Sequence, residues 1–351
     1  MKTYRHLYPQ VWDFENLYLA YRKARKGKRG KAYVAAYERR QEEELLALQT
    51  ELREKSYTPG PYASFYIHEP KRRLISAAPF RDRVAHHALC RVLEPVWEPR
   101  FVETSYANRV GKGTHRALDQ TTQYARRYCW FLQCDVRQFF PSIDHAILRG
   151  EFTHYIADED VLWLCDLILN SGVGVLKGEY EMVYFPGDGL FSACRPRGLP
   201  IGNLTSQFWA NIYLNNFDHF VKRELKCPAY IRYVDDFLLF GDDLEQLYYW
   251  RGEIIRKMAA LRLTIHEESA LVYPTQCGIP FLGFRIFPEY RRVKSRKVVS
   301  YRRRLRRALA GSFSYTSLSA SVRGWVNHVR YADTHGLTHA MLKFKVPRAQ
   351  A

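Results

Sequence analysis

The chain has 351 residues and contains 54 lysine and arginine residues against 36 aspartate and glutamate residues, a formal net charge of +18. Its length allows two or three compact units, and a hydrophobic fraction of 47% excludes a largely disordered protein. So large an excess of positive charge is typical of proteins that bind a polyanion, and we expect nucleic acid as the partner instead of a merely soluble basic surface.

Cysteine usage and the N-terminal sequence indicate where the protein works. The seven cysteines form no CxxC pair and no cysteine and histidine spacing that suits zinc, so we expect buried free thiols in a reducing compartment. The N-terminus lacks the apolar core of a signal peptide, and no apolar run reaches 18 residues. We therefore expect a cytoplasmic protein with no membrane partner.

The N-terminal part of the chain is predicted to be helical and basic. Residues 17–54 carry apolar side chains at helical spacing, and their first half contains a basic cluster that includes Arg22 and Arg25. These arginines could bind phosphates or lie on an ordinary solvated helix. Lys112, in the sequence GKGTHRAL, could contact phosphate or could simply be exposed, and the sequence does not favour either.

A basic hairpin is predicted next. Alternating side chains around Phe65 and Ile67 indicate a strand. A turn with Lys71 and Arg73 leads into a second strand, and a helix begins after Pro79. A basic hairpin ahead of a helix can clamp a polyanionic ligand.

The sequence YCWFLQCDVRQFFPSIDHAIL is predicted to form a buried strand that ends near Asp135, followed by a helix after Pro141. Because side chains alternate along a strand, Asp135 shares a face with Gln133 and lies opposite Cys134. A single aspartate at a strand end is usually a cap, so its meaning depends on a partner elsewhere in the chain.

That partner is the pair Asp235 and Asp236 in the sequence YIRYVDDFLLFGDD. Aspartate disfavours the half-buried surface of a strand, so the pair is predicted to lie at a bend between two strands. Asp242 and Asp243 follow at the strand exit and are predicted to be solvated turn residues.

The remaining segments complete the prediction in chain order. Residues 171–198 are rich in glycine and turn residues and are expected to form hairpins and loop, whereas 204–225 and 251–263 have helical spacing. The sequence GIPFLGFRIFP predicts one further strand, and 291–351 is predicted to be a small basic helical unit.

Three carboxylates converge if the end of the Asp135 strand lies beside the turn with Asp235 and Asp236 in an antiparallel sheet. Such carboxylates repel one another unless cations neutralise them, and hard oxygen ligands suit Mg²⁺. Two Mg²⁺ ions about 4 Å apart are the arrangement that in-line phosphoryl transfer uses. With basic segments on either side, the sequence predicts template-directed polymerisation of nucleotides.

Five motifs, in the order that the family shows, resemble those of reverse transcriptases: PKRRLISAAPFRDRVAHHAL in the fingers, LQCDVRQFFPSIDH and YVDD at the metal site, FLGFRIFP beside the primer end and RGWVNHVRYA in the thumb. The resemblance implies an α+β right-hand polymerase fold with fingers, a palm with an antiparallel sheet, and a helical thumb. We assign the N-terminal extension and fingers to 1–125, the palm to 126–290 with an inserted segment around 151–198, and the thumb to 291–351.

The resemblance also implies roles for single residues at the metal site. Asp135 and Asp235 would bind two Mg²⁺ ions, or Mn²⁺ in their place, with help from the Val136 carbonyl. Asp236 would add negative charge and a looser contact. All three aspartates are therefore expected to be catalytic.

For the nucleotide, the resemblance implies contacts from Lys71 and Arg73 to the triphosphate and exclusion of a ribose 2′-hydroxyl by Phe140, so deoxynucleotides are the expected substrates. Gly202 would permit close approach to the nascent base pair, although a plain helix-start glycine is an alternative. Nucleic-acid contacts are expected from Arg22, Arg25, Lys112, Arg296, Lys297, Arg303 and Arg307.

One departure from the family pattern concerns the sequence LPIGNLTSQ. Most reverse transcriptases carry glutamine where this chain has Ile201, and an aliphatic residue there, together with Ser206 and Gln207, resembles the enzymes of diversity-generating retroelements. Those enzymes copy an RNA template with frequent errors at adenines, and an aliphatic side chain cannot hydrogen-bond the nascent pair. Ile201 could equally be a packing residue.

The same resemblance implies a template RNA, a primer or cDNA strand and deoxynucleoside triphosphates (dNTPs) as ligands, and a small basic helical-bundle protein as an accessory partner. The alternatives are a stand-alone bacterial reverse transcriptase used in antiviral defence, an orphan group II intron-type enzyme and a non-catalytic RNA-binding protein with the polymerase fold. His86, His87 and His145 lie near predicted helix starts and are expected to cap or pack.

Overall fold

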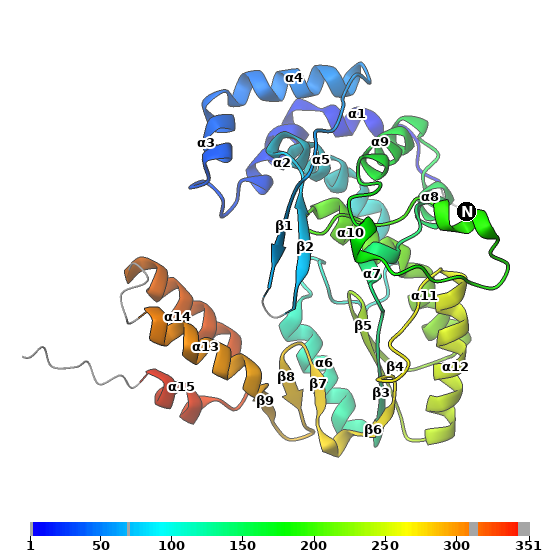
Figure 1. Cartoon of the computed structure of the whole chain (residues 1–351), viewed down its shortest axis with the longest axis vertical. Coiled ribbons are helices and arrows are strands. Elements are labelled where there is room, and N and C mark those ends of the chain that lie inside the picture. The colour runs from blue at the N-terminus through cyan, green and yellow to red at the C-terminus, as the bar shows by residue number, and fades with distance from the viewer. Residues whose placement is uncertain (1–2, 69–70, 309–314, 343–351) are drawn as a thin grey trace, which may run out of the picture.

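The computed structural model of the chain describes residues 3–68, 71–308 and 315–342. An upper helical module, a central sheet with its helices, and a smaller helical unit that projects to one side make up the molecule (Figure 1). Among the described residues, no helix has the length and apolarity needed to cross a membrane. All seven cysteines are free thiols, as the sequence predicts, but only four are buried.

Five helices form the upper module. Apolar residues recur at helical spacing in its second and fourth helices, where Leu17, Leu45 and Leu48 are fully buried. The helix expected after Pro79 begins there, with Pro79 as its N-cap. The five helices are α1 (Tyr8–Trp12), α2 (Phe14–Ala24), α3 (Ala32–Arg39), α4 (Gln41–Arg53) and α5 (Phe80–Trp97), and α5 ends in a 3-10 turn at Glu98–Arg100.

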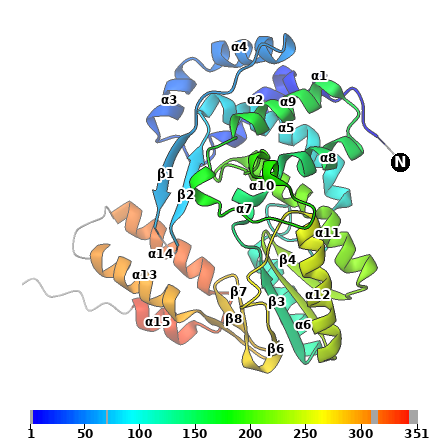
Figure 2. The ribbon, with the colours of Figure 1, turned by 45° about the vertical axis from the view of Figure 1, so that its right-hand side comes forward.

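The predicted basic hairpin is present below this module. β1 (Ala63–Ile67) pairs antiparallel with β2 (Arg73–Ala77), and Phe65 lies opposite Ile75. Both strands project away from the helices, as the two ribbon views show (Figures 1 and 2). Every residue of β1 is exposed, whereas β2 is partly buried. The hairpin is therefore held in place through β2.

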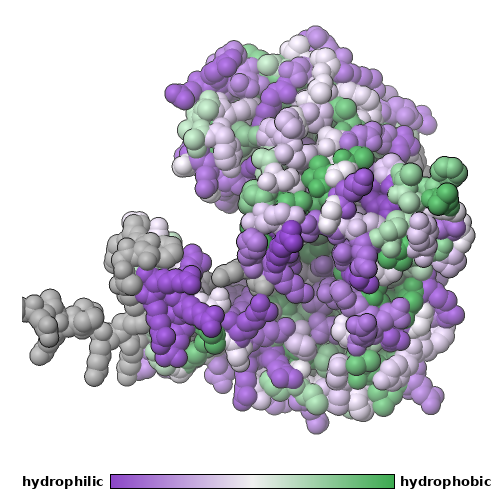
Figure 3. Space-filling view, in the orientation of Figure 1, coloured by the Kyte–Doolittle hydropathy of each residue, from purple (hydrophilic) through white to green (hydrophobic). Residues whose placement is uncertain are grey.

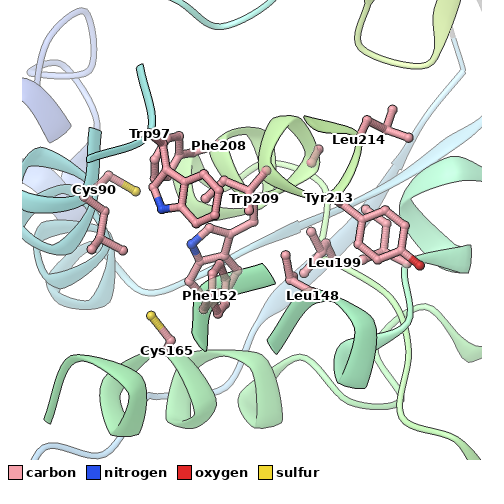
Figure 4. Packing of buried hydrophobic residues seen from close by; sticks show 14 of the residues in the cluster. Cys90, Trp97, Leu148, Phe152, Cys165, Leu199, Phe208, Trp209, Tyr213 and Leu214 are labelled. Atoms are coloured by element: carbon pink, nitrogen blue, oxygen red, sulfur yellow. The ribbon is translucent and has the colours of Figure 1, made fainter. Parts of the chain in front are cut away.

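The central sheet is antiparallel with the strand order β4–β5–β3–β6. Side chains alternate between its two faces. One face, which includes Leu132, packs into the larger core, where Phe152 and Trp209 lie 5.3 Å apart between ring centroids (Figure 4). The opposite face, which includes Phe131, packs against a helix and a second sheet. The strands are β3 (Trp130–Asp135), β4 (Ala229–Tyr233), β5 (Asp236–Gly241) and β6 (Val272–Pro274).

Seven helices accompany this sheet. They are α6 (Thr114–Arg127), α7 (Phe139–Ser142), α8 (His145–Tyr155), α9 (Glu159–Ser171), α10 (Leu204–Tyr213), α11 (Asn215–His219) and α12 (Leu244–Ala260). The predicted helical run over 204–225 is confirmed as α10, α11 and a π-helical turn at Phe220–Glu224. The helix predicted over 251–263 is also confirmed, as the greater part of α12.

The hairpins expected in 171–198 do not form. That range, which is described throughout, contains 3-10 turns at Lys177–Glu179 and Leu190–Cys194 and no strand. Side-chain bonds hold the segment instead. Arg262 donates to Asp188 at 2.6 and 2.7 Å, and Arg195 donates to Asp144 at 2.6 and 2.9 Å. These bidentate contacts fix the loop without a partner strand.

The segment GIPFLGFRIFP forms two strands, where the sequence predicts one. Leu282 and Gly283 separate them in a two-residue turn with φ of 48° and 90°. A two-residue turn with positive φ at both positions matches the twist of a β-hairpin. Glycine adopts positive φ without steric cost. The strands of this second sheet are β7 (Ile279–Phe281), β8 (Phe284–Ile286) and β9 (Arg291–Val293), which pairs with β8. The basic segment after 290 thus opens with a strand.

The projecting unit contains α13 (Ser295–Arg307), α14 (Tyr315–Val329) and α15 (His335–Leu342). Tyr301 stacks on Trp325 in its small core, with ring centroids 4.5 Å apart. The space-filling view shows a wide indentation between this unit and the upper module, and the surface over α13 is strongly hydrophilic (Figure 3). The rest of the predicted thumb, 309–314 and 343–351, lies outside the described residues.

Candidate active site

The catalytic candidates meet where β3 ends beside the β4–β5 turn. In the β3–β5 register Asp135 lies directly opposite Asp236, so both side chains are on the same face of the sheet. Asp235 precedes Asp236 in the turn, and its carbonyl accepts a hydrogen bond from the Val136 N–H at 3.2 Å. Val234 in this turn has φ 61°, a left-handed conformation that is strained for a β-branched residue. The structure thus brings the three aspartates to one strand end.

Burial raises the pKa of all three carboxyls, and repulsion from neighbouring carboxylates adds to the rise at Asp235 and Asp236. Burial raises the pKa of Asp235 to about 6 and that of Asp236 to about 7, and the negative charge of Asp135 adds to both shifts. The pKa of Asp135 is raised as well, again because of burial. A bound cation would relieve this repulsion by stabilising the ionised carboxylates.

The donors at this strand end suit a hard cation that is shared with a substrate. Because the Val136 N–H points to the turn, its carbonyl does too, and no donor among the described residues bonds that carbonyl. No group of three or more His, Cys, Asp or Glu side chains in the described ranges could hold a metal by itself. Mg²⁺ usually binds one or two carboxylates and completes its shell with water and substrate phosphates, so this open arrangement fits it.

The strand that carries Asp135 is fixed along its other edge. The Arg137 N–H donates to the Thr264 carbonyl at 2.8 Å, and the His266 N–H donates to the Asp135 carbonyl at 3.0 Å. Burial raises the pKa of Asp135, and the positive charge of His266 opposes that shift. His266 was not predicted from the sequence because no local pattern marks it.

A buried ion pair supports the turn from behind. Arg232 in β4 donates to both carboxylate oxygens of Asp218 at 2.7 and 2.6 Å, and both side chains are fully buried. The same guanidinium donates to the Val234 carbonyl at 3.0 Å, and Tyr230 donates to Asp218 at 2.7 Å. This support was not predicted from the sequence, although an arginine inside the apolar run YIRYV is a signal that could have identified it.

Lys71 and Arg73 of the basic hairpin act electrostatically on the carboxylates. Lys71 and Arg73 are exposed. Their positive charges oppose the burial-driven rise in the pKa of Asp135, and Arg73 acts on Asp235 in the same way. Both predicted triphosphate contacts therefore lie within electrostatic reach of the aspartates, where cations can bind the phosphates of a ligand.

The LPIGN segment lies against the second strand of the hairpin. The Ser76 N–H donates to the Ile201 carbonyl at 2.8 Å, and Ile201 is half-buried. Gly202 has φ 120°, and a Cβ there would lie 3.0 Å from Ile75 Cγ2. Both the backbone and the close approach therefore require glycine, beyond what a helix start needs. Gln207 is exposed on α10.

Asn203 holds this segment on β2 and was not identified from the sequence. Its Nδ2 donates to the Ser76 and Pro200 carbonyls at 2.9 and 3.0 Å, and its Oδ1 accepts from the Ala78 N–H at 3.1 Å. Ser206 donates to the Pro200 carbonyl at 2.7 Å. Since these polar groups are buried and bonded, they fix the segment relative to the hairpin.

Phe140 is half-buried beside the strand that carries Asp135. Its carbonyl accepts a hydrogen bond from the Leu199 N–H at 2.9 Å, and its ring centroid lies 5.4 Å from that of Phe139. These contacts tie Phe140 to the LPIGN segment, and its role toward the ribose stays a prediction.

The nucleic-acid candidates divide into exposed and ion-paired side chains. Arg25 pairs with Glu38 and donates to the Tyr21 hydroxyl at 3.2 Å. Lys112 pairs with Glu103, and only 9% of its side chain is exposed. A phosphate contact by Arg25 or Lys112 would require an internal ion pair to break. The exposed candidates are Arg22, Arg296, Lys297, Arg303 and Arg307.

The three histidines near helix starts pack, as the sequence predicts. Burial lowers the pKa of His86 to about 3 and that of His87 to about 4, so both are neutral at pH 7. His145 is buried, and its Nε2 lies 2.8 Å from the Gly198 carbonyl oxygen.

Comparison with known proteins identifies related chains. Protein YkfC of Escherichia coli (strain K12) is 25% identical over 301 residues, which cover 73% of this chain and 74% of that protein. Group II intron-encoded protein LtrA of Lactococcus lactis subsp. cremoris is 28% identical over 183 residues, or 51% of this chain and 28% of that protein. Nuclear intron maturase 2, mitochondrial, of Arabidopsis thaliana is 28% identical over 51% of this chain and 26% of that protein. The chain thus spans little more than a quarter of the two intron proteins.

A structure of telomerase from Candida albicans in complex with a fragment of telomeric RNA has a TM-score of 0.45 and 12% identity, over 71% of this chain and 51% of that chain. That similarity is too weak to support a conclusion. The family described as "Reverse transcriptase (RNA-dependent DNA polymerase)" matches residues 67–286, which is more than half of the chain and includes the three aspartates. The chain therefore belongs to the reverse transcriptase family.

Proposed function

We propose that the chain is an RNA-directed DNA polymerase that extends a primer by two-metal-ion nucleotidyl transfer. The observation that carries the proposal is the pairing of Asp135 with Asp236 across β3 and β5, with Asp235 in the adjoining turn, in a chain of the reverse transcriptase family. The raised pKa values of the three carboxyls support the binding of cations at this place.

Asp135, Asp235 and the Val136 carbonyl would hold two Mg²⁺ ions, or Mn²⁺ in their place, and Asp236 would add negative charge beside them. When bound, the ions activate the attacking hydroxyl and neutralise charge on the leaving pyrophosphate. The chain's own contribution is a rigid strand end, held by the neighbouring strand segment and by the buried ion pair behind the turn, that keeps the carboxylates oriented.

The incoming nucleotide would bind beside the hairpin and the LPIGN segment, which pack against each other. Lys71 and Arg73 would bind its triphosphate, and Phe140 would exclude a 2′-hydroxyl, so dNTPs are the substrates. Gly202 would leave room for the nascent pair beside Ile201, and Gln207 is the remaining nucleotide candidate. Arg73 begins β2, the LPIGN segment is bonded to β2, and the Phe140 carbonyl is bonded to Leu199 at the start of that segment, which supports a single nucleotide site.

The template and primer would lie along the indentation between the upper module and the thumb. The hydrophilic surface over α13 supports this path, because exposed arginines and lysines bind phosphate without regard to sequence (Figure 3). An RNA template is supported by the family and by relatives whose names describe an intron-encoded protein and an intron maturase.

Primer extension on an RNA template tests the proposal. The wild-type chain with Mg²⁺ and dNTPs is expected to extend an annealed primer, and Asp135→Asn and Asp235→Asn are expected to reduce extension to background while keeping the fold. Asp242→Asn is the matched control, because Asp242 is exposed at the end of β5, where it accepts a bond from the Cys129 N–H at 2.8 Å, and its variant should extend normally. A folded wild-type chain that extends no primer with either metal ion would refute the proposal.

We further propose that copying is error-prone at template adenines, as in diversity-generating retroelements that use a helical-bundle accessory protein. The half-buried Ile201 supports this, since its aliphatic side chain lies beside the hairpin and cannot hydrogen-bond a nascent pair. Ile201→Gln is expected to lower the adenine error frequency when the cDNA is sequenced. An unchanged error spectrum would contradict the proposal.

The relatives favour a second candidate function. They include an intron-encoded protein and an intron maturase, so the chain could act on an intron RNA instead. Sequencing the RNA that co-purifies with the protein separates the candidates: a template with a matching variable repeat supports diversification, and an intron supports the second function. Stable RNA binding without any extension would instead indicate a non-catalytic RNA-binding protein.

A further inference from the structure

One glutamine connects the catalytic strand end to the second sheet. Gln133 lies in β3, two residues before Asp135 and on the same face. Its Nε2 donates to Asp236 Oδ1 at 3.0 Å and to the Pro280 carbonyl in β7 at 3.2 Å. A single side-chain amide therefore bridges an aspartate of the central sheet and the first strand of the neighbouring sheet, which lies beside it in both ribbon views (Figures 1 and 2).

Asp236 also interacts electrostatically with Lys294, the residue that precedes α13. Burial lowers the pKa of Lys294, and the negative charge of the Asp236 carboxylate partly opposes that shift. The Lys294 N–H in turn donates to the Gly283 carbonyl in the β7–β8 turn at 3.0 Å. Gln133 therefore links Asp236 to the second sheet, and Lys294 links that sheet to the start of α13.

Asp135 and Asp236, which lie opposite each other in the sheet, differ in the hydrogen bonds to their carboxylates. Among the described residues, no hydrogen-bond donor reaches the Asp135 carboxylate, whereas Gln133 donates to the carboxylate of Asp236. Two aspartates that are equivalent in the strand register therefore have different surroundings. Asp135 is open for a ligand, and Asp236 is tied to neighbouring protein.

We propose that Gln133 is a positioning residue that ties Asp236 to Pro280 and so fixes the catalytic turn relative to the β7–β8 hairpin. The β7–β8 hairpin contains most of the sequence FLGFRIFP, which resembles the reverse transcriptase motif beside the primer end, and the inference rests on the proposed function. A tie of this kind keeps the carboxylates and the primer end in register, because a hydrogen-bonded support sets the orientation of the side chain that it holds.

Single-turnover primer extension with Gln133→Met tests the tie. Methionine has nearly the same length but no donor, and we expect the rate constant for nucleotide addition to fall about 10–100-fold, the usual effect of losing such a support. The KM for dNTPs should stay near that of the wild type, because the triphosphate contacts are on the other hairpin. Gln49→Met is the matched control: its Nε2 donates to the Trp12 carbonyl at 3.1 Å in the upper module, and its loss should leave the rate constant unchanged.

Gln133→Lys separates hydrogen bonding from packing. Lysine keeps a donor at similar reach, so this variant should retain more activity than Gln133→Met. A packing role predicts the reverse order, because methionine preserves the volume and lysine adds a charge. Wild-type rates in Gln133→Met, or equal losses in both variants, would overturn the tie.

Hydrogen exchange gives a second measurement that does not depend on polymerase activity. Gln133→Met should exchange faster than the wild type in peptides that cover 233–237 and 279–286, and Gln49→Met should not. Unchanged exchange in both peptides would also overturn the tie. A wild-type chain that extends no primer would refute the proposed function alone, since exchange would still decide whether Gln133 joins the two sheets.

Discussion

Arg232 and Asp218 form a bidentate ion pair, with donor–acceptor distances of 2.7 and 2.6 Å, in which both side chains are fully buried. The pair lies behind the turn that carries the catalytic candidates, and Arg232 also donates to the Val234 carbonyl in that turn at 3.0 Å. A buried ion pair contributes little net stability compared with well-packed apolar residues, but loss of one partner leaves an uncompensated buried charge. The effect of the ion pair on the strained turn can therefore be measured separately from its effect on the free energy of unfolding.

Replacement of one partner should be far more harmful than replacement of both. Asp218→Leu leaves Arg232 buried without its carboxylate and is expected to lower the free energy of unfolding by about 3–5 kcal/mol. The double variant Asp218→Leu with Arg232→Met should recover much of that loss in urea unfolding, while primer extension stays low because the bond to Val234 is absent.

The exposed pair Arg40 and Glu43 provides the control for that experiment. Their side chains are 62% and 64% exposed, so Arg40→Ala should change the free energy of unfolding by less than about 1 kcal/mol. Equal losses in Asp218→Leu and Arg40→Ala would show that burial does not set the cost of breaking the inner pair.

We expect a side chain at Gly202, in the LPIGN segment, to clash with the hairpin. With φ 120° and a Cβ position 3.0 Å from Ile75 Cγ2, Gly202→Ala is strained in its backbone and presses on the hairpin. We expect a loss of about 1–3 kcal/mol in the free energy of unfolding and a higher KM for dNTPs, because the hairpin must move. Gly189→Ala, at φ −102° and with no atom within 4 Å of the new Cβ, should behave as the wild type. A Gly202→Ala variant with unchanged stability and KM would contradict this account.

The parts of the site that the sequence predicts correctly are those with a local signature. Alternation of apolar side chains marks the strand that ends at Asp135, and an aspartate pair between two apolar runs marks the turn at Asp235 and Asp236. Each depends on residues within a few positions of one another, so one sequence is enough. The three aspartates meet at one strand end because the two strands pair antiparallel.

The parts that the sequence missed depend on contacts between distant residues. Asn203 bonds the Ser76 carbonyl across 127 positions, and Gln133 bonds the Pro280 carbonyl across 147. No local period encodes such partners, and each amide could equally have been a solvated surface residue. The turn at Leu282 and Gly283 was missed for another reason, because apolar residues on both sides concealed a two-residue hairpin within one apparent strand.

Buried histidines predict how stability depends on pH. Burial lowers the pKa of His86 from 6.5 to about 3, so below pH 6.5 the unfolded chain binds a proton that the folded chain does not. The stability that neutral His86 contributes is therefore complete above about pH 6.5 and is lost as the pH falls toward 3. Between pH 7 and pH 5 this loss amounts to about 2 kcal/mol.

Unfolding measured at pH 7 and at pH 5 in the wild type and in His86→Gln isolates this effect. The wild type should lose more stability than the variant between the two pH values, by the amount given above. His87, whose pKa burial lowers to about 4, acts in the same direction in both proteins and cancels from the comparison. Identical pH slopes in the two proteins would mean that His86 is protonated in the folded chain.

Exposed and ion-paired arginines should differ in their effect on nucleic-acid binding. Each phosphate contact that is lost lowers the slope of log affinity against log salt by about 0.7–0.9. Arg303→Gln with Arg307→Gln removes two exposed charges from α13, so the slope for an RNA–DNA hybrid, measured by fluorescence anisotropy over a range of salt concentrations, should fall by about 1.5. Arg25→Gln should leave the slope unchanged and lower the melting temperature, because Arg25 pairs with Glu38. If Arg25→Gln instead lowers the slope as each α13 change does, the ion pair opens on binding and α2 contacts the nucleic acid directly.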